Sequence, residues 1–308
     1  MRRRRGQRHH ALARIALLLA LALPACDVDL PAPPPPPDRD DAVTVGSFDF
    51  PESELVAEIY AQALESHGLE VVRVFAVGPR ELTMPALERG LLEVMPEYSG
   101  SALDFLGGTP TANAPATFSA LRDKLETRGL VTLRASAAED RNVFVVTDDT
   151  AERLGVRHLS DLRDHAASLR IGGPPECRLR PLCLAGLEDR YDLRFERFIA
   201  LDAAGPLTLQ ALDEGFVDVA LLFSTHPRLR GGGLRVLVDD RGLQPAEQIV
   251  PLVAASAAAR FEPALSAALD PVSEALTSRS LRLMNGQIDE GAPIGDVAHA
   301  WLAGHGLD

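Results

Sequence analysis

The sequence alternates short β-branched runs with segments of helical periodicity, and this alternation limits the chain to an α/β fold. Residues 43–47 form one short β-branched run, and residues 53–66 then place apolar side chains every three or four positions before Gly68. Strand-like runs follow at 71–77, 91–95, 143–147, 169–172, 195–200, 217–223 and 249–254, and helical segments at 81–89, 118–128, 151–154, 207–214, 264–276, 281–286 and 295–302. Strands that alternate with helices predict a largely parallel sheet with helices on both faces.

The length of 308 residues predicts two α/β units, since one domain commonly holds about 150 residues. Strand-like crossings near 142–147 and 248–254 would join the units, with the last helices returning to the first. This gives lobe 1 as residues 43–145 plus 250–308 and lobe 2 as residues 146–249. Two lobes joined at two points leave an inter-lobe cleft, where loops at the carboxyl ends of strands face each other and can bind a ligand.

The first 42 residues predict an export signal and a tether. Residues 1–25 carry six Arg and no acidic residue, and their apolar run at 15–23 is too short to span a hydrocarbon layer about 30 Å thick. The Leu-Pro-Ala-Cys sequence that ends at Cys26 resembles the bacterial lipobox, which predicts lipidation of Cys26 and an exported, lipid-anchored protein. Residues 26–42 contain a Pro-rich run that favours an extended, stiff tether. The alternatives are a core helix that ends at a chance Cys and a Pro-rich ligand for a recognition domain.

Residue patterns typical of catalysis or metal binding are absent from the sequence. It contains no P-loop, no dinucleotide-binding glycine motif after a strand, no nucleophile elbow and no His-Glu-x-x-His. Its eight His are scattered at spacings that predict no shared face for a metal. We therefore expect no enzyme activity, cofactor or metal, and we expect Trp301 to lie in the core. The formal net charge of −13, which persists despite the Arg-rich start, argues against nucleic acid as a partner.

Cys177 and Cys183 are separated by five residues in a loop rich in Pro and Gly. In an exported protein such a pair predicts a disulfide, and lipidation of Cys26 would leave these two as the remaining thiols. A redox-active pair is the alternative, although the spacing differs from Cys-x-x-Cys. A metal site is a weaker alternative, because no His lies nearby in the sequence.

Four stretches, taken in order, resemble the substrate-binding proteins of ABC importers for quaternary amines, the osmoprotectant or glycine betaine/choline-binding family. They are residues 45–53 (VGSFDFPES), 96–101 (PEYSGS), 212–227 (LDEGFVDVALLFSTHP) and 243–251 (LQPAEQIVP). The resemblance runs from about residue 43 to the end and implies the type II periplasmic binding protein fold. It also implies a small osmoprotectant such as glycine betaine or choline as ligand and an ABC permease as partner. The family holds quaternary ammonium groups against aromatic faces by cation–π attraction.

The resemblance implies a ligand site at nine positions. They are Ser47, Asp49, Phe50 and Ser53 in the first strand-to-helix turn, Tyr98 and Ser101 in the second, Phe144 on a crossing strand, and Phe223 and Thr225 in the distal lobe. Tyr98 matches a family Tyr, whereas Leu209 stands where members have an aromatic residue. Core packing is the alternative for Phe144 and Phe223. The alternative function is that of a sensor lipoprotein with the same fold, which binds a different small solute and signals instead of transporting it.

Overall fold

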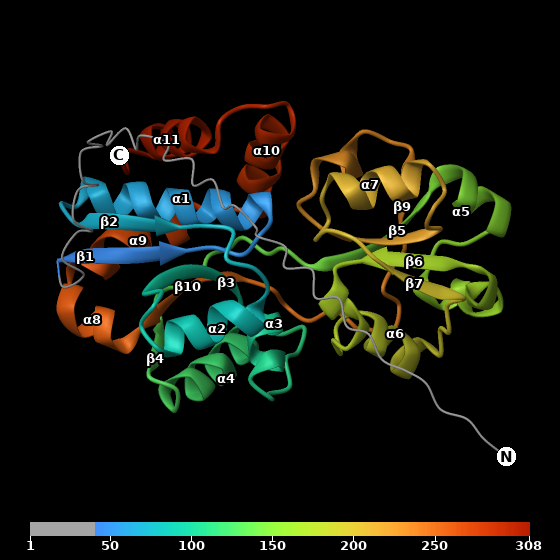
Figure 1. Ribbon diagram of the computed structural model, residues 1–308, viewed down its shortest axis with the longest axis horizontal. Coiled ribbons are helices and arrows are strands. Elements are labelled where there is room, and N and C mark those ends of the chain that lie inside the picture. The colour runs from blue at the N-terminus through green and yellow to red at the C-terminus, as the bar shows by residue number, and fades with distance from the viewer. Residues whose placement is uncertain (1–40) are drawn as a thin grey trace, which may run out of the picture. The chain divides into compact units, whose positions relative to one another are not determined.

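The computed structural model describes residues 41–308, which form two five-stranded sheets flanked by helices (Figure 1). The predicted signal peptide at 1–25, the lipidation site Cys26 and nearly all of the tether at 26–42 lie outside the described residues. Within residues 41–308, each helix falls short of the length and apolar character needed to cross a membrane.

The first sheet, in lobe 1, has the strand order β2-β1-β3-β10-β4. Its strands are β1 (Ala42–Gly46), β2 (Glu70–Val74), β3 (Val94–Tyr98), β4 (Leu130–Thr132) and β10 (Ile249–Ala254). Strand β1 runs parallel to β2 and β3, whereas β10 runs antiparallel to β3 and β4. The carboxyl ends of β1 and β3 therefore lie at the same edge of the sheet, where the loops that follow them can meet.

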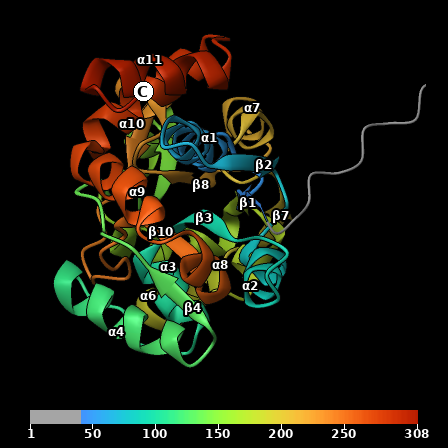
Figure 2. The same cartoon turned by 90° about the vertical axis from the view of Figure 1, so that its left-hand side faces the viewer.

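Helices cover both faces of the first sheet (Figures 1 and 2). They are α1 (Pro51–Ser66), α9 (Ala264–Ala275), α10 (Ser278–Asp289) and α11 (Ile294–His305) on one face, and α2 (Arg80–Glu88), α3 (Ser99–Phe105) and α4 (Ala114–Glu126) on the other, with α8 (Ala255–Phe261) next to β10. Leu55, Ile59 and Leu64 of the predicted apolar stripe of α1 are fully buried, but the helix is buried on its other sides as well, because α9 and α11 also pack against it. Trp301 lies in the same core, as predicted, so the last helices do return to lobe 1.

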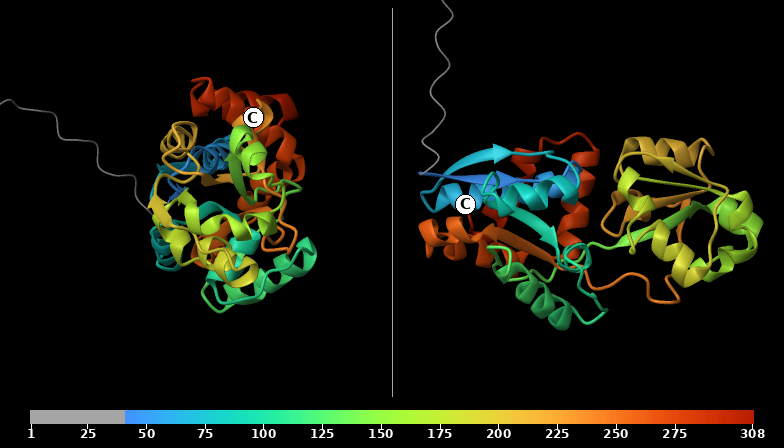
Figure 3. Two further views of the ribbon diagram at one scale, coloured as in Figure 1. Left: turned by 90° about the vertical axis from the view of Figure 1, so that its right-hand side faces the viewer. Right: turned by 60° about the horizontal axis from the view of Figure 1, so that its bottom comes forward.

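The second sheet, in lobe 2, has the strand order β7-β6-β8-β5-β9. Lobe 2 faces the viewer in the left view of Figure 3. Its strands are β5 (Asn142–Thr147), β6 (Arg170–Gly173), β7 (Arg197–Ala200), β8 (Val219–Phe223) and β9 (Leu234–Val236). Strand β6 runs parallel to β7 and β8, whereas β5 runs antiparallel to β8 and β9. The helices of this lobe are α5 (Asp148–Leu154), α6 (Leu184–Tyr191) and α7 (Pro206–Asp213), with short 3-10 helices η1 (Leu159–Asp164), η2 (Ala166–Ser168), η3 (Pro175–Arg178) and η4 (Pro227–Arg230).

The predicted α/β class is confirmed, but the sheets are mixed instead of largely parallel. The reason lies in the two strands that follow the crossings. Strand β5 begins at the sheet edge where β8 ends, since Asn142 pairs with Phe223, and β10 begins where β3 ends, since Ile249 pairs with Tyr98. A strand that enters a lobe at the edge where the parallel strands finish must run in the opposite direction.

The crossings also lie earlier in the chain than predicted. The residues near 142–147 and 248–254 are not crossings, because β5 belongs wholly to the second sheet and β10 to the first. The chain passes between the lobes in the segments that join β4 to β5 and β9 to β10. The expected division at residue 145 therefore cuts through β5, and the boundary belongs before that strand. The short edge strands β4 and β9 were not predicted, because three residues carry too little periodicity to be recognised.

Candidate ligand-binding cleft

A cleft of about 740 Å³ is lined by residues from both sheets and from both crossings, a volume within the range of small-molecule sites. Lobe 1 contributes loops at the carboxyl ends of β1 and β3 and the start of α2. Lobe 2 contributes the loop after β6 and the end of β8. The lining includes residues 48–50, 79–81 and 174–177, residues 179–183, and Tyr98, Ser101, Asp104, Phe105, Asp140, Asn142, Phe223 and Glu247.

Four aromatic rings line the cleft at the strand ends. Phe48, Phe50 and Tyr98 come from lobe 1, and Phe223 comes from the end of β8 in lobe 2. The ring centroid of Phe50 lies 5.8 Å from that of Phe48, 5.9 Å from that of Tyr98 and 5.0 Å from that of Phe223. The contact between Phe50 and Phe223 therefore joins the two lobes. Aromatic faces attract cations through the ring quadrupole, so this arrangement suits an ammonium group.

Arg80 occupies one face of this aromatic group. Its Cζ atom lies 5.1 Å from the Phe48 ring centroid, and its guanidinium donates to Glu97 Oε1 at 2.6 Å and Oε2 at 2.8 Å. Both side chains are buried, so the charge of Arg80 is balanced within the protein. A ligand cation would therefore meet the rings of Phe50, Tyr98 and Phe223 instead of that face of Phe48.

Five of the nine expected site residues line the cleft: Asp49, Phe50, Tyr98, Ser101 and Phe223. Their common origin is the edge of each sheet where parallel strands end, as expected for open α/β sheets. Tyr98 is the last residue of β3, and its Oη donates to Glu52 Oε1 at 3.1 Å. This hydrogen bond fixes the orientation of the ring.

Ser47 and Ser53 do not line the cleft, contrary to expectation, because their hydroxyl groups hold the turn between β1 and α1. Ser47 Oγ accepts from the Ala76 backbone N–H and donates to the Phe48 carbonyl, each at 2.9 Å. Ser53 Oγ accepts from the Phe48 backbone N–H at 3.0 Å. Both side chains are fully buried and act by positioning the residues that do face the cleft.

Phe144 and Thr225 are also absent from the cleft lining. Phe144 is 1% exposed and packs in the core of lobe 2, so core packing is the correct alternative for this residue. Phe144 is the third residue of β5, and its side chain points to one face of the sheet, into this core, whereas the cleft lies beyond the end of the strand. Thr225 is buried, and its hydroxyl donates to Glu52 while its backbone N–H donates to Asp140 Oδ1 at 2.9 Å. It joins the lobes instead of facing a ligand.

Glu52 and Asp140 are two buried carboxyl groups next to Tyr98. Glu52 Oε2 accepts from Asn285 Nδ2 at 2.7 Å, and Asp140 Oδ1 accepts from Ser224 Oγ at 3.0 Å. Burial raises the pKa of both carboxyl groups, and the charge of Glu52 raises the pKa of Asp140 further. A raised pKa means that these two carboxyl groups hold a proton to higher pH than exposed carboxyl groups do, and a nearby cation would favour their ionised form.

Glu247, on the second crossing, is a third buried carboxyl group and faces the cleft. Its Oε2 atom accepts from the backbone N–H groups of Gly100 at 2.9 Å and Ser101 at 3.0 Å, and its Oε1 accepts from Ser101 Oγ at 2.6 Å. Glycine is needed at position 100, because a Cβ there would lie 2.6 Å from the Ala246 carbonyl oxygen. Burial raises the pKa of Glu247 to about 7.

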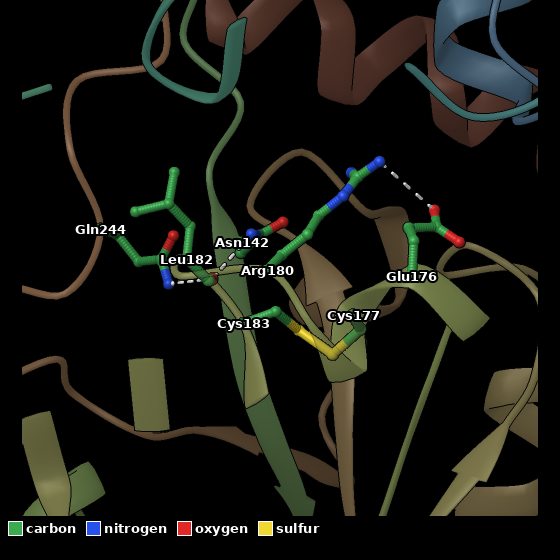
Figure 4. The surroundings of a disulfide bond; sticks show 7 residues. All are labelled: Asn142, Glu176, Cys177, Arg180, Leu182, Cys183 and Gln244. Carbon is green, nitrogen blue, oxygen red and sulfur yellow. Dashed lines mark hydrogen bonds and ion pairs between the residues drawn. A yellow bond between two sulfur atoms is a disulfide. The ribbon is translucent and has the colours of Figure 1, made fainter. Parts of the chain in front are cut away.

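A disulfide closes the loop that forms much of the lobe 2 wall (Figure 4). Cys177 and Cys183 are bonded, with their Cα atoms 5.2 Å apart, which confirms the predicted pair. The Leu182 carbonyl accepts from Asn142 Nδ2 at 3.1 Å and from Gln244 Nε2 at 3.0 Å. These bonds fix the loop to the start of β5 and to the second crossing, so this wall of the cleft is held at several points.

The same loop also reaches the opposite lobe, where Arg180 donates to Glu81 Oε2 at 2.8 Å. Sequence reasoning missed this pair, together with Asp140, Arg80 and Glu247. Glu247 lies inside a stretch that carries the family resemblance, so a signal was present for it. Arg80 and Asp140 lie outside every such stretch, and only the fold brings them to the cleft.

The family model for the substrate-binding domain of ABC-type glycine betaine transport systems matches residues 41–304. The chain is 27% identical over 259 residues to a glycine-betaine-binding protein of Pseudomonas aeruginosa, covering 81% of this chain and 83% of that protein. It is also 27% identical over 274 residues to the glycine betaine-binding protein YehZ of Escherichia coli, covering 84% of this chain and 89% of the relative.

A solved structure described as a glycine betaine/carnitine/choline ABC transporter has the same fold. It superposes with a TM-score of 0.67 at 22% identity, covering 86% of this chain and 99% of that one. The type II periplasmic binding protein fold expected from the resemblance is thereby confirmed. With the family model matching almost all of the described residues, the chain belongs to the family of glycine betaine-binding substrate-binding domains of ABC transporters.

Proposed function

We propose that this protein captures a small quaternary ammonium solute in its cleft and delivers it to an ABC permease, without covalent chemistry. The observation that carries the proposal is the group of rings from Phe50, Tyr98 and Phe223, contributed by both lobes and surrounded by carboxyl groups. A quaternary ammonium group has no N–H to donate, so aromatic faces and negative charge are the features that can hold it.

The same proposal includes export and a lipid anchor at Cys26. Its support is the basic and apolar sequence of residues 1–25 and the lipobox-like ending at Cys26. The Pro-rich tether at 26–42 would then hold the binding unit away from the lipid surface, near its permease. The sensor alternative is not proposed, because no feature of residues 41–308 favours it over transport.

Calorimetric titration of the purified protein with glycine betaine, choline and carnitine tests the ligand class. We expect saturable binding of at least one of these ligands. Phe223→Ala should weaken that binding about 2- to 30-fold, which corresponds to the loss of one cation–π contact of roughly 0.5–2 kcal/mol. Phe216→Ala is the matched control, because Phe216 is 60% exposed, also lies in lobe 2 and does not line the cleft.

Absence of heat with all three ligands up to millimolar concentration would remove the quaternary amine assignment. Equal effects of Phe223→Ala and Phe216→Ala, in variants with unchanged thermal unfolding, would instead show that the ligand binds elsewhere on the protein.

A further inference from the structure

The ionisable side chains of the cleft are mostly acidic. Among the described residues, the lining holds six acidic side chains, Asp49, Glu81, Asp104, Asp140, Glu176 and Glu247, and two arginines. Asp140 and Glu247 are buried and accept hydrogen bonds from hydroxyl and backbone N–H groups. Within residues 41–308, neither of these two carboxyl groups forms an ion pair with an arginine. A cleft of this composition attracts ligands with net positive charge.

The groups that could hold a ligand carboxylate are already bound to carboxylates of the protein. Arg80 forms its two short bonds with Glu97, and Arg180 donates to Glu81 at the opposite wall. A carboxylate that entered beside either guanidinium would have to share it with the acid already there. Binding energy for a zwitterionic ligand would be reduced accordingly.

Ser101 is the third residue in the cleft that could donate hydrogen bonds to a ligand carboxylate, but its donors are already bound to Glu247. The Ser101 hydroxyl and backbone N–H both donate to the Glu247 carboxylate, at 2.6 Å and 3.0 Å, and Glu247 is only 2% exposed. The segment that carries Glu247 packs so closely on Gly100 that a Cβ there would contact the Glu247 Cδ at 3.0 Å. The close approach of Gly100 to Ala246 and Glu247 and the hydrogen bonds of the carboxylate together hold Glu247 in place.

We propose that the cleft selects a quaternary ammonium cation whose other end is uncharged over a zwitterion, and that Glu247 is a specificity-determining residue that rejects a ligand carboxylate. This inference rests on the proposed function and adds the charge class of the ligand to it. Two carboxylates placed side by side repel each other, and such a juxtaposition across a binding interface weakens binding. A hydroxyl at the same end of the ligand brings no such repulsion.

The first test compares three ligands of similar shape on the purified protein at pH 8, where Glu247 is ionised. Choline is a cation, glycine betaine is a zwitterion and 3,3-dimethylbutan-1-ol is a neutral analogue of choline. We expect choline to bind at least about 10-fold more tightly than either of the others, a ratio that corresponds to about 1.4 kcal/mol. Glycine betaine binding as tightly as choline, or more tightly, would overturn the inference and leave the proposed function intact. Failure of every quaternary amine to bind would overturn both.

The second test replaces Glu247 with Gln, which keeps the shape and an oxygen acceptor for the Gly100 and Ser101 N–H groups but removes the charge. We expect the ratio of choline affinity to glycine betaine affinity to fall about 10-fold in Glu247→Gln. Glu126→Gln makes the same change on an exposed residue of α4 that does not line the cleft, and the ratio should stay as in the wild-type protein.

If Glu247→Gln is folded and its ratio of choline affinity to glycine betaine affinity is unchanged, Glu247 does not determine the specificity. Thermal unfolding of both variants checks that each is folded. The three-ligand comparison on the wild-type protein decides the charge class by itself if Glu247→Gln does not fold.

Discussion

Replacing Arg80 with Met should lower the free energy of unfolding by about 3–5 kcal/mol, because it leaves a buried carboxylate without its counterion. The Glu97 side chain is 1% exposed and the Arg80 side chain is 6% exposed, so the carboxylate is little hydrated and depends on the guanidinium for its charge balance. The Arg80 Cζ also lies over the Phe48 ring, and this contact is lost as well. Urea denaturation and thermal unfolding measure the change.

Two further variants separate this effect from a general loss of charge. Arg128→Met breaks the ion pair with Glu88, in which the Arg128 side chain is 43% exposed, and an exposed pair of this kind contributes about 1 kcal/mol or less. The double variant Arg80→Met with Glu97→Gln should recover part of the lost stability, because no uncompensated charge remains. Similar losses of unfolding free energy in Arg80→Met and Arg128→Met would show that the buried ion pair contributes no more to stability than the exposed one.

Raising the pH from 5.5 to 8 should lower the free energy of unfolding of the ligand-free protein by about 2 kcal/mol through Glu247 alone. The pKa of this group is about 7 in the folded protein and near 4.5 ordinarily, so the folded state holds the proton more tightly. The stabilisation is fully present below the lower pKa and is lost as the pH rises through the higher one. Glu52 and Asp140, whose pKa values are also raised by burial, act in the same direction.

Unfolding experiments at several pH values between 5.5 and 8 measure this loss, with Glu247→Gln as the reference. The variant cannot ionise at this position, so its stability should fall less over the same range, by the contribution of Glu247. A wild-type protein that becomes more stable as the pH rises over this range would contradict the burial of ionisable acids in the cleft.

Local sequence patterns were sufficient for several features of the fold. The apolar period of residues 53–66 identifies α1 as a helix, but it does not show that α9 and α11 bury the other sides of that helix. The pair Cys177 and Cys183 could be assigned because few alternatives remain when three Cys include one in a lipobox-like sequence. Strand direction could not be obtained this way, because side-chain period is the same in parallel and antiparallel strands.

The cleft was predictable only in part, because its chemistry depends on contacts between distant positions. Tyr98 and Phe50 lie in stretches that carry the family resemblance, and both line the cleft, Tyr98 at the end of β3 and Phe50 at the start of α1. Glu247 reaches Ser101 across 146 positions of the chain, and Asn285 reaches Glu52 across 233. Such pairs follow from the return of the chain to lobe 1 and leave no local pattern in the sequence. The core position of Phe144 depends equally on the register of β5, which periodicity does not fix.

A crystal structure of the protein grown with choline is the most direct test of ligand capture by the aromatic group. We expect the trimethylammonium group to lie within about 6 Å of the ring centroids of Phe50, Tyr98 and Phe223, the range in which cation–π attraction operates. Choline bound outside the cleft, or inside it with its ammonium group away from these rings, would contradict the proposed mode of recognition.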